Sequence, residues 1–229
     1  MTRKFILAHD VGTGGDKAVL TDLRGQILAS AYQDYRLHYP QPGWVEQDPE
    51  ELWQTVAATT RTVIHQAAID PAEILGVGIS AQMFNLLPID ERGIPLTRML
   101  SWLDVRSIQQ ADKILSGETP KLLFEHTGNI PTAKDVIPKI LWLKEKCPDL
   151  WARTYKLLDC KEYILYRLTD TIATDWHGAS VYFLFDPHKK TWSKAACDHL
   201  GIPVEMLPEA FPCTEVIGTV TPPAATVSG

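Results

Sequence analysis

The chain has 229 residues, 45% of them hydrophobic and 22% charged, as in a globular protein with one large domain and a sizeable core. Its formal net charge is −6 and no run is rich in lysine and arginine, which argues against a nucleic-acid partner. The first apolar stretch, Phe5–Ala8, is too short for a signal peptide or a membrane span, so we expect a cytoplasmic protein without a membrane partner.

The chain opens with three predicted strands. Phe5–Asp10 is an apolar run of strand length, and Ala18–Thr21 and Ile27–Ala31 flank the turn sequence DLRG, which is the pattern of a β-hairpin. Strands joined so closely are expected to be antiparallel neighbours.

A helix and a fourth strand follow. Asp48, Pro49 and Glu51 form an N-cap signature for a helix over residues 48–68, in which apolar residues recur at helical spacing. The run Ile74–Ser80 then predicts a buried strand that can lie parallel to the first strand, with glycines that allow close approach of another backbone.

The middle of the chain is predicted to be mostly helical, with helices over 104–115, 120–126, 132–146 and 159–168. The closing residues TPPAATVSG are expected to form neither helix nor strand, and no linker divides the chain. The four cysteines form no CxxC pair and the seven histidines show no metal-site spacing. We therefore expect free thiols and no structural zinc.

The glycine turn DVGTGG follows the first strand and carries the first functional signal. It matches neither GxxxxGK[ST] nor GxGxxG, and a second strand follows it instead of a helix. Its glycines let backbone N–H groups approach an anion, and an acid that ends a buried strand can hold Mg²⁺. A plain hairpin turn with an aspartate cap is the alternative. The candidate residues for phosphate and metal are Asp10, Gly12, Thr13 and Lys17.

This turn resembles the first phosphate motif of the actin/hexokinase/Hsp70 superfamily, and the chain is most similar to the FGGY family of carbohydrate kinases. The matches continue in order with PGWVEQDPEELW, GISAQM, SWLDVRS, PKILWLKE, DCKEYILYRLTD, TDWHGAS and LFDPHKKTWS. Several of these motifs are xylulokinase-like.

The resemblance implies an α/β, RNase H-like fold in which helices flank a mixed five-stranded sheet. It makes residues 1–229 an N-terminal sugar-binding domain with a helical insertion at roughly 104–200. It also implies that the general-base aspartate and the C-terminal ATP-binding domain lie outside this chain, which alone should be inactive. We therefore expect a fragment of a longer kinase.

The resemblance also assigns roles to residues. Asp10 and Thr13 take part in catalysis at the transferring phosphate, and Asp10 holds the metal. The residues that line the sugar site are Gln82, Met83, Phe84, Trp102, Asp104 and Arg106. As alternatives, Trp102 and Met83 are core residues, and Asp104 and Arg106 are a cap and a surface ion pair. Lys134 is a weaker candidate.

Phe84 departs from the family pattern, in which xylulokinases carry histidine and glycerol kinases an acid. An apolar wall discriminates weakly between hydroxylated ligands, so the expected acceptor is a xylulose-like ketose or a less hydroxylated polyol. The expected cofactors are ATP and Mg²⁺, and the partners are the sugar, the chain's own C-terminal domain and a possible second copy in a homodimer. Alternatives are a non-catalytic sugar-binding or regulatory module and another actin-like enzyme, the latter disfavoured by SWLDVRS and PGWVEQDPEELW.

Overall fold

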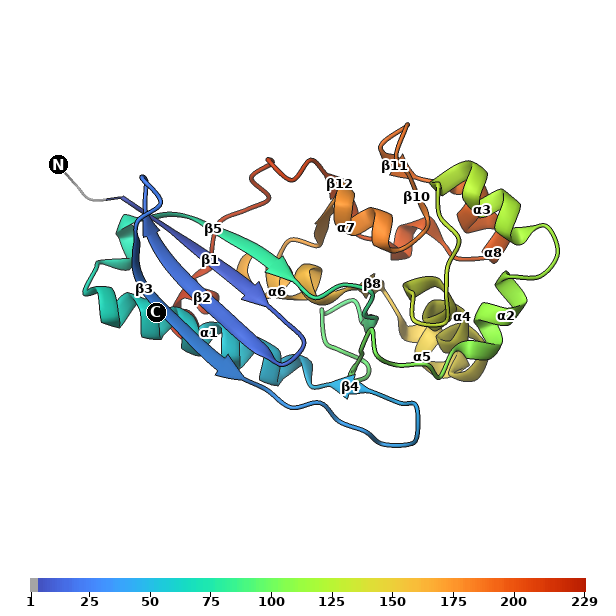
Figure 1. Ribbon diagram of the computed structural model, residues 1–229, viewed down its shortest axis with the longest axis horizontal. Helices are drawn as coiled ribbons and strands as arrows, with labels where there is room; N and C mark the ends of the chain where they lie inside the picture. Colours follow the sequence, from blue (N-terminus) through green and yellow to red (C-terminus); the bar gives the residue numbers. More distant parts are fainter. Residues whose placement is uncertain (1–3) are drawn as a thin grey trace.

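The structure is a computed structural model that describes residues 4–229. Its main sheet has the order β3-β2-β1-β5, with β1 (Phe5–Val11), β2 (Gly15–Asp22), β3 (Ile27–Asp34) and β5 (Ile74–Ala81). β1, β2 and β3 are antiparallel and β5 is parallel to β1 (Figure 1), which confirms the predicted meander and fourth strand. Within residues 4–229 the sheet has four strands where five were expected, because no strand pairs with the outer edge of β5.

Helix α1 (Pro49–Ala67) covers one face of this sheet. Asp48 caps it by accepting the N–H of Glu50 at 2.9 Å, as the N-cap signature predicted. Val63 of α1 packs on sheet residues in one apolar cluster, with Phe5, Leu7, Ala18, Leu20 and Ala29. Because side chains alternate along a strand, Asp10 and Lys17 point to the opposite face, where both are exposed.

A polar network also joins α1 to the sheet, directly beneath the glycine turn. His9 Nδ1 lies 2.9 Å from Asp16 Oδ2, and His9 Nε2 lies 3.1 Å from the Thr60 hydroxyl. The Thr59 hydroxyl donates to the same Asp16 oxygen. These residues are buried, so the two strand ends that carry the turn are fixed to α1 by hydrogen bonds as well as by apolar contact.

A second, mostly helical part lies beside the sheet and has its own core (Figure 1). It contains α2 (Ile108–Ile114), α3 (Thr119–Thr127), α4 (Val136–Lys146), α5 (Pro148–Arg153), α7 (Trp176–Val181) and α8 (Lys194–Leu200). This confirms the predicted helical middle, although α2 begins at Ile108 and not at Asp104. Among the residues described, none of the helices is both long enough and apolar enough to span a membrane.

Short strands and 3₁₀ turns connect these parts. The strands are β4 (Glu46–Gln47), β6 (Leu87–Ile89), β7 (Met99–Leu100), β8 (Lys156–Leu158), β9 (Ala173–Asp175), β10 (Phe185–Asp186), β11 (Thr191–Trp192) and β12 (Glu209–Phe211). The 3₁₀ turns are η1 (Pro71–Glu73) and η2 (Val204–Met206). Among them, β4 pairs with β7, which brings the PGWVEQ segment against the SWLDVRS segment.

Two further helices pack against α1. α6 (Cys160–Thr169) begins at Asp159 with a capping box completed by Glu162. The prediction for the last nine residues was wrong, because Pro222–Ser228 forms helix α9. Thr221 caps α9 and proline occupies its first turn, a start signal that the expectation of a loop ignored. Ala224 of α9 is buried, so contact with α1 and α6 completes a helix too short to be stable alone.

Candidate phosphate and sugar site

The glycine turn has its carbonyl groups occupied by hydrogen bonds. The N–H of Gly12 donates to Gly15 O at 2.9 Å and closes the turn. The hydroxyl of Tyr32 in β3 donates to Gly14 O at 3.3 Å, and the hydroxyl of Tyr35, which directly follows β3, donates to Gly12 O. The N–H of Tyr35 also donates to Gly14 O, at 3.2 Å. The strand next to the turn therefore fixes the direction of its peptide groups.

Thr13, at the tip of the turn, is held from two other segments. Gln47 Nε2 donates to Thr13 O at 3.0 Å, and Trp102 Nε1 donates to the Thr13 hydroxyl oxygen at 2.8 Å. Across residues 4–229, the N–H groups of Thr13 and Gly14 have no hydrogen-bond acceptor. Two consecutive N–H groups without an acceptor can bind an anion, which favours a phosphate loop over a plain turn.

Asp10 lies beside this loop on the open face of the sheet. Its neighbours in the strand register are Lys17 of β2 and Ser80 of β5, and all three residues are exposed. Within the described part of the chain, no cluster of three or more histidine, cysteine or acidic side chains is arranged to hold a metal ion. A single exposed carboxylate fits Mg²⁺ that arrives with a phosphate ligand, because such Mg²⁺ takes one or two carboxylates and keeps water.

Gln82 reaches the same loop through a second glutamine. Its backbone N–H donates to Val11 O at 2.8 Å, and its Nε2 donates to Gln47 Oε1 at 2.8 Å. Because Gln47 Nε2 is committed to Thr13 O, this hydrogen-bond pattern fixes the orientation of both amides. Gln82 Oε1 is buried and has no donor within residues 4–229.

Asn85 connects the Gln82 and Trp102 segments. Its Oδ1 accepts the backbone N–H of Trp102 at 3.0 Å, and its Nδ2 donates to Gln82 O at 3.3 Å and to Asp159 Oδ1 at 2.7 Å. Burial and the neighbouring Glu162 raise the pKa of the Asp159 carboxyl above its ordinary value. Asn85 thus places Gln82 and Trp102 in one site by bonds that no sequence pattern indicated.

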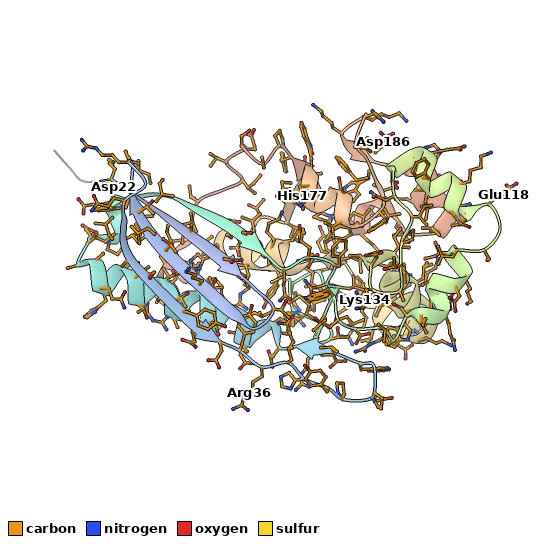
Figure 2. The ribbon with its side chains drawn as sticks, viewed as in Figure 1. Asp22, Arg36, Glu118, Lys134, His177 and Asp186 are labelled. Carbon is orange, nitrogen blue, oxygen red and sulfur yellow. The ribbon has the colours of Figure 1, made fainter. Side chains whose placement is uncertain are left out.

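Met83 and Phe84 directly follow Gln82, in the turn after β5. Met83 is partly exposed, and Phe84 has a φ of 66°, in the left-handed region that is unusual for an aromatic residue. The Phe84 ring lies 6.3 Å from the Phe183 ring, between centroids, so it packs on the helical part as well as bordering the site. Lys134 lies where the sheet and the helical part meet (Figure 2), 5.9 Å from the centroid of the Trp102 ring.

The structure places Asp104 and Arg106 beneath the site. Asp104 is fully buried and accepts the N–H of Val45 at 2.7 Å and both Nε and Nη2 of Arg106. Arg106 also donates to Glu46 Oε1 at 2.8 Å and lies 3.6 Å from the centroid of the Trp44 ring. This buried ion pair fixes the chain next to Trp102, and direct contact of Asp104 or Arg106 with a sugar stays a prediction.

Sequence reasoning missed several residues that shape the site: Tyr32, Tyr35, Gln47, Asn85 and Lys139. Gln47 and Lys139 lie inside the family-like motifs PGWVEQDPEELW and PKILWLKE, so motif position was an available signal for them. The two tyrosines and Asn85 act through contacts distant in sequence and gave no signal.

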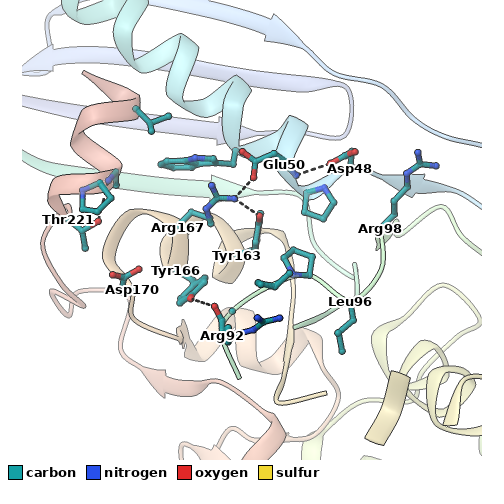
Figure 3. A pocket seen from close by; sticks show the side chains of 18 of the residues that line it. Asp48, Glu50, Arg92, Leu96, Arg98, Tyr163, Tyr166, Arg167, Asp170 and Thr221 are labelled. Carbon is teal, nitrogen blue, oxygen red and sulfur yellow. Dashed lines mark hydrogen bonds and ion pairs between the residues drawn. The ribbon is translucent and has the colours of Figure 1, made fainter. Parts of the chain in front are cut away.

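A separate cavity of about 720 Å³ lies between α1, α6, α9 and the 92–98 segment (Figure 3). None of the predicted site residues lines it. Its central cation, Arg167, donates to Glu50 at 2.6 Å and to the Tyr163 hydroxyl at 2.7 Å, and lies 5.0 Å from the centroid of the Trp53 ring. Because this charge is already paired, we place the functional site at the glycine turn.

The fold and the glycine turn define a domain of the actin/hexokinase/Hsp70 ATPase class. Residues 5–229 match the family model described as "FGGY family of carbohydrate kinases, N-terminal domain". The chain belongs to this family, as the resemblance indicated, and it corresponds to the family's N-terminal domain.

Named relatives agree with this assignment. The chain is 31% identical to a glycerol kinase of Thermococcus onnurineus (strain NA1) over 94% of its own length and 44% of the relative's length. It is 32% identical to a xylulose kinase of Lactococcus lactis subsp. lactis over 94% and 43% of the two lengths. The crystal structure of a gluconate kinase from Lactobacillus acidophilus superposes with a TM-score of 0.92 at 28% identity, covering 99% of this chain and 46% of that one. The chain therefore spans less than half the length of these relatives.

Proposed function

We propose that this chain is the sugar-binding part of an ATP-dependent kinase that transfers the γ-phosphate of ATP to a hydroxyl of a ketose or polyol. The observation that carries the proposal is the pair of free N–H groups at Thr13 and Gly14 beside an exposed Asp10. Phosphoryl transfer depends on positioning and charge neutralisation, and this loop offers both.

In this proposal the loop residues act on the phosphate side. Gly12 and Thr13 contribute the loop backbone and the hydroxyl, and Lys17 offsets negative charge on the same face as Asp10. Asp10 would hold Mg²⁺, which neutralises phosphate charge when it is bound. We infer that the general base and most of the adenosine contacts belong to a C-terminal domain. The relatives named above, which are more than twice as long as the matched part, support this inference.

The sugar side is formed by the Gln82–Phe84 segment and Trp102. The Gln82–Phe84 segment offers polar groups, and the Trp102 ring offers an apolar face to the carbon chain. Met83 and Phe84 form the remaining wall, while the Asp104–Arg106 pair supports Trp102 from below. Because the Phe84 side chain is apolar, it discriminates weakly between ketoses and polyols as the phosphate acceptor.

The proposal is tested by a thermal-shift screen of the complete kinase, meaning this chain joined to its C-terminal domain. The screen covers ketoses and polyols, with gluconate added because of the structural likeness. A ligand that binds only the native state raises the melting temperature. We expect at least one sugar or polyol to do so, with turnover on addition of MgATP. Binding without turnover supports the non-catalytic sugar-binding module, and no binding by any compound contradicts both forms of the proposal.

Phe84 provides a direct test of the sugar wall. In the complete kinase, Phe84→His restores a hydrogen-bonding side chain, so we expect kcat/KM for D-xylulose to rise by about tenfold, the effect of roughly one added hydrogen bond. Steady-state kinetics measures the change. An unchanged or lower kcat/KM would mean that residue 84 does not face the sugar.

We also infer that the protein acts in the cytoplasm. All four cysteines carry free thiols, which is the usual state in a reducing compartment.

A further inference from the structure

Lys139 of α4 is a buried lysine that the proposed function does not use. Its side chain is fully buried, with an exposed fraction of 0%. Its Nζ donates to Phe84 O at 2.8 Å and also donates to Lys134 O. A lysine is almost never fully buried unless its charge is balanced, so its position requires an explanation.

The two acceptors belong to the two segments that border the sugar site. Phe84 lies in the left-handed backbone region, and the bond to Lys139 holds its carbonyl in this unusual conformation. The carbonyl of Lys134 lies before Asp135, the N-cap of α4, and so accepts no bond from within the helix. The Lys139 amine supplies a donor to it from the first turn of the helix.

The ammonium group is surrounded by acidic residues without contacting any of them directly. Asp159, Asp104 and Asp135 favour its charge, and Arg106 opposes it. Within residues 4–229 no carboxylate oxygen lies within 4.0 Å of Nζ, so backbone carbonyls are its bonded partners. Burial lowers the pKa of Lys139 to about 8.

We propose that Lys139 is a positioning residue, whose ammonium group ties the Phe84 turn to the Lys134 segment and so sets the shape of the acceptor site. Lys139 does not touch the sugar. Its charge-assisted bonds hold two backbone segments, and the proper spacing of Gln82, Phe84 and Trp102 depends on them. This inference rests on the proposed function.

The consequence is an alkaline limit on sugar binding. When Lys139 loses its proton, its bonds to the two carbonyls lose their charge assistance, and the site loosens. With a pKa of about 8, the protonated fraction falls to about one tenth at pH 9, and apparent affinity falls in proportion to the binding-competent fraction. KM for the sugar should therefore rise up to about tenfold between pH 7 and pH 9, while kcat changes little.

Other ionisable groups lie in the same cluster. Asp159 faces Lys139 from the start of α6, with Glu162 next to it, and Asp104, Asp135 and Arg106 face it from neighbouring segments. The Lys139→Gln variant distinguishes titration of Lys139 from titration of these other groups. It keeps an N–H donor at this position and removes only the titrating amine.

The experiment measures kcat and KM for the accepted sugar from pH 6.5 to 9.5 in the complete kinase. It compares the wild type with Lys139→Gln, Lys139→Met and the control Lys144→Met. Lys144 lies on the same helix and its amine donates to Gly201 O, away from the site. We expect a flat KM profile in Lys139→Gln, a KM raised about tenfold at all pH values in Lys139→Met, and a wild-type profile in Lys144→Met.

A flat wild-type KM profile overturns the inference without the use of any variant, as does an alkaline rise that persists in Lys139→Gln. An unchanged KM in Lys139→Met overturns it too. If the complete protein phosphorylates no sugar, the proposed function has failed. Hydrogen exchange then tests the positioning role of Lys139 independently of activity. We expect faster exchange at residues 82–85 and 131–135 in Lys139→Met than in Lys144→Met, and equal exchange contradicts the positioning role.

Discussion

At the scale of single residues, the site depends on side chains that bond to the backbone of the glycine turn. Tyr35, Tyr32 and Gln47 occupy its carbonyl groups, and none of them contacts a ligand in our proposal. Their hydrogen bonds fix the orientation of the peptide groups of the turn. Residues of this kind change affinity through geometry, so their substitution should affect nucleotide binding without unfolding the protein.

Tyr35→Phe tests this directly. The change removes the hydroxyl that donates to Gly12 O and leaves that carbonyl without its donor, at a cost of about 1 kcal/mol or more. We expect KM for ATP to rise about fivefold to tenfold in the complete kinase, which steady-state kinetics will show. Tyr39→Phe is the matched control, because Tyr39 is largely exposed. Equal effects of the two changes would contradict the role of Tyr35.

At the scale of helices and strands, the sequence predicted the elements whose patterns are local. The β1–β2–β3 meander and β5 follow from short apolar runs and the DLRG turn, and α1 follows from helical spacing and the Asp48 cap. The same local reasoning placed the start of α2 at Asp104, but the carboxylate of Asp104 instead bonds to Val45 N, far away in the sequence. Helix α9 was missed although Thr221 and the prolines after it are a local start signal, and its stability comes from packing on α1 and α6.

The candidate site likewise contains residues that local sequence predicted and residues that it did not. Asp10, Gly12, Thr13 and Lys17 are local to one turn and were predicted together, and the structure places them together. Asn85 and the bonds made by Lys139 depend on contacts between segments that are distant in the chain. No spacing rule predicts such contacts, so these bonds appear only in the structure.

The cap of α1 gives a prediction at this scale. Asp48→Ala removes the acceptor for the first free N–H groups of the helix, which costs about 1 kcal/mol. We expect the melting temperature of this 229-residue chain to fall by about 2–4 °C, measured by circular dichroism. Asp112→Ala, at an exposed position inside α2, serves as the control. A shift no larger than that of the control would show that the Asp48 cap adds nothing to stability.

At the scale of the whole molecule, we propose that the chain forms one wall of an active site. The glycine turn is joined to the Gln82 and Trp102 segments through Gln47 and Asn85, and α4 contacts the Phe84 turn through Lys139. Groups that would hold adenosine and deprotonate the sugar are assigned to the C-terminal domain, in keeping with relatives more than twice as long as the region they share with this chain.

The proposed kinase activity is tested most directly by measuring ADP release with MgATP and a panel of ketoses, polyols and gluconate. It compares the complete kinase, its Asp10→Asn variant and residues 1–229 alone. We predict sugar-dependent ADP release by the complete kinase and no activity for residues 1–229. In Asp10→Asn we predict that the rate falls at least 100-fold, because one electrostatic group that stabilises the transition state is removed. Sugar phosphorylation by residues 1–229 alone, or full activity in Asp10→Asn, would contradict the account.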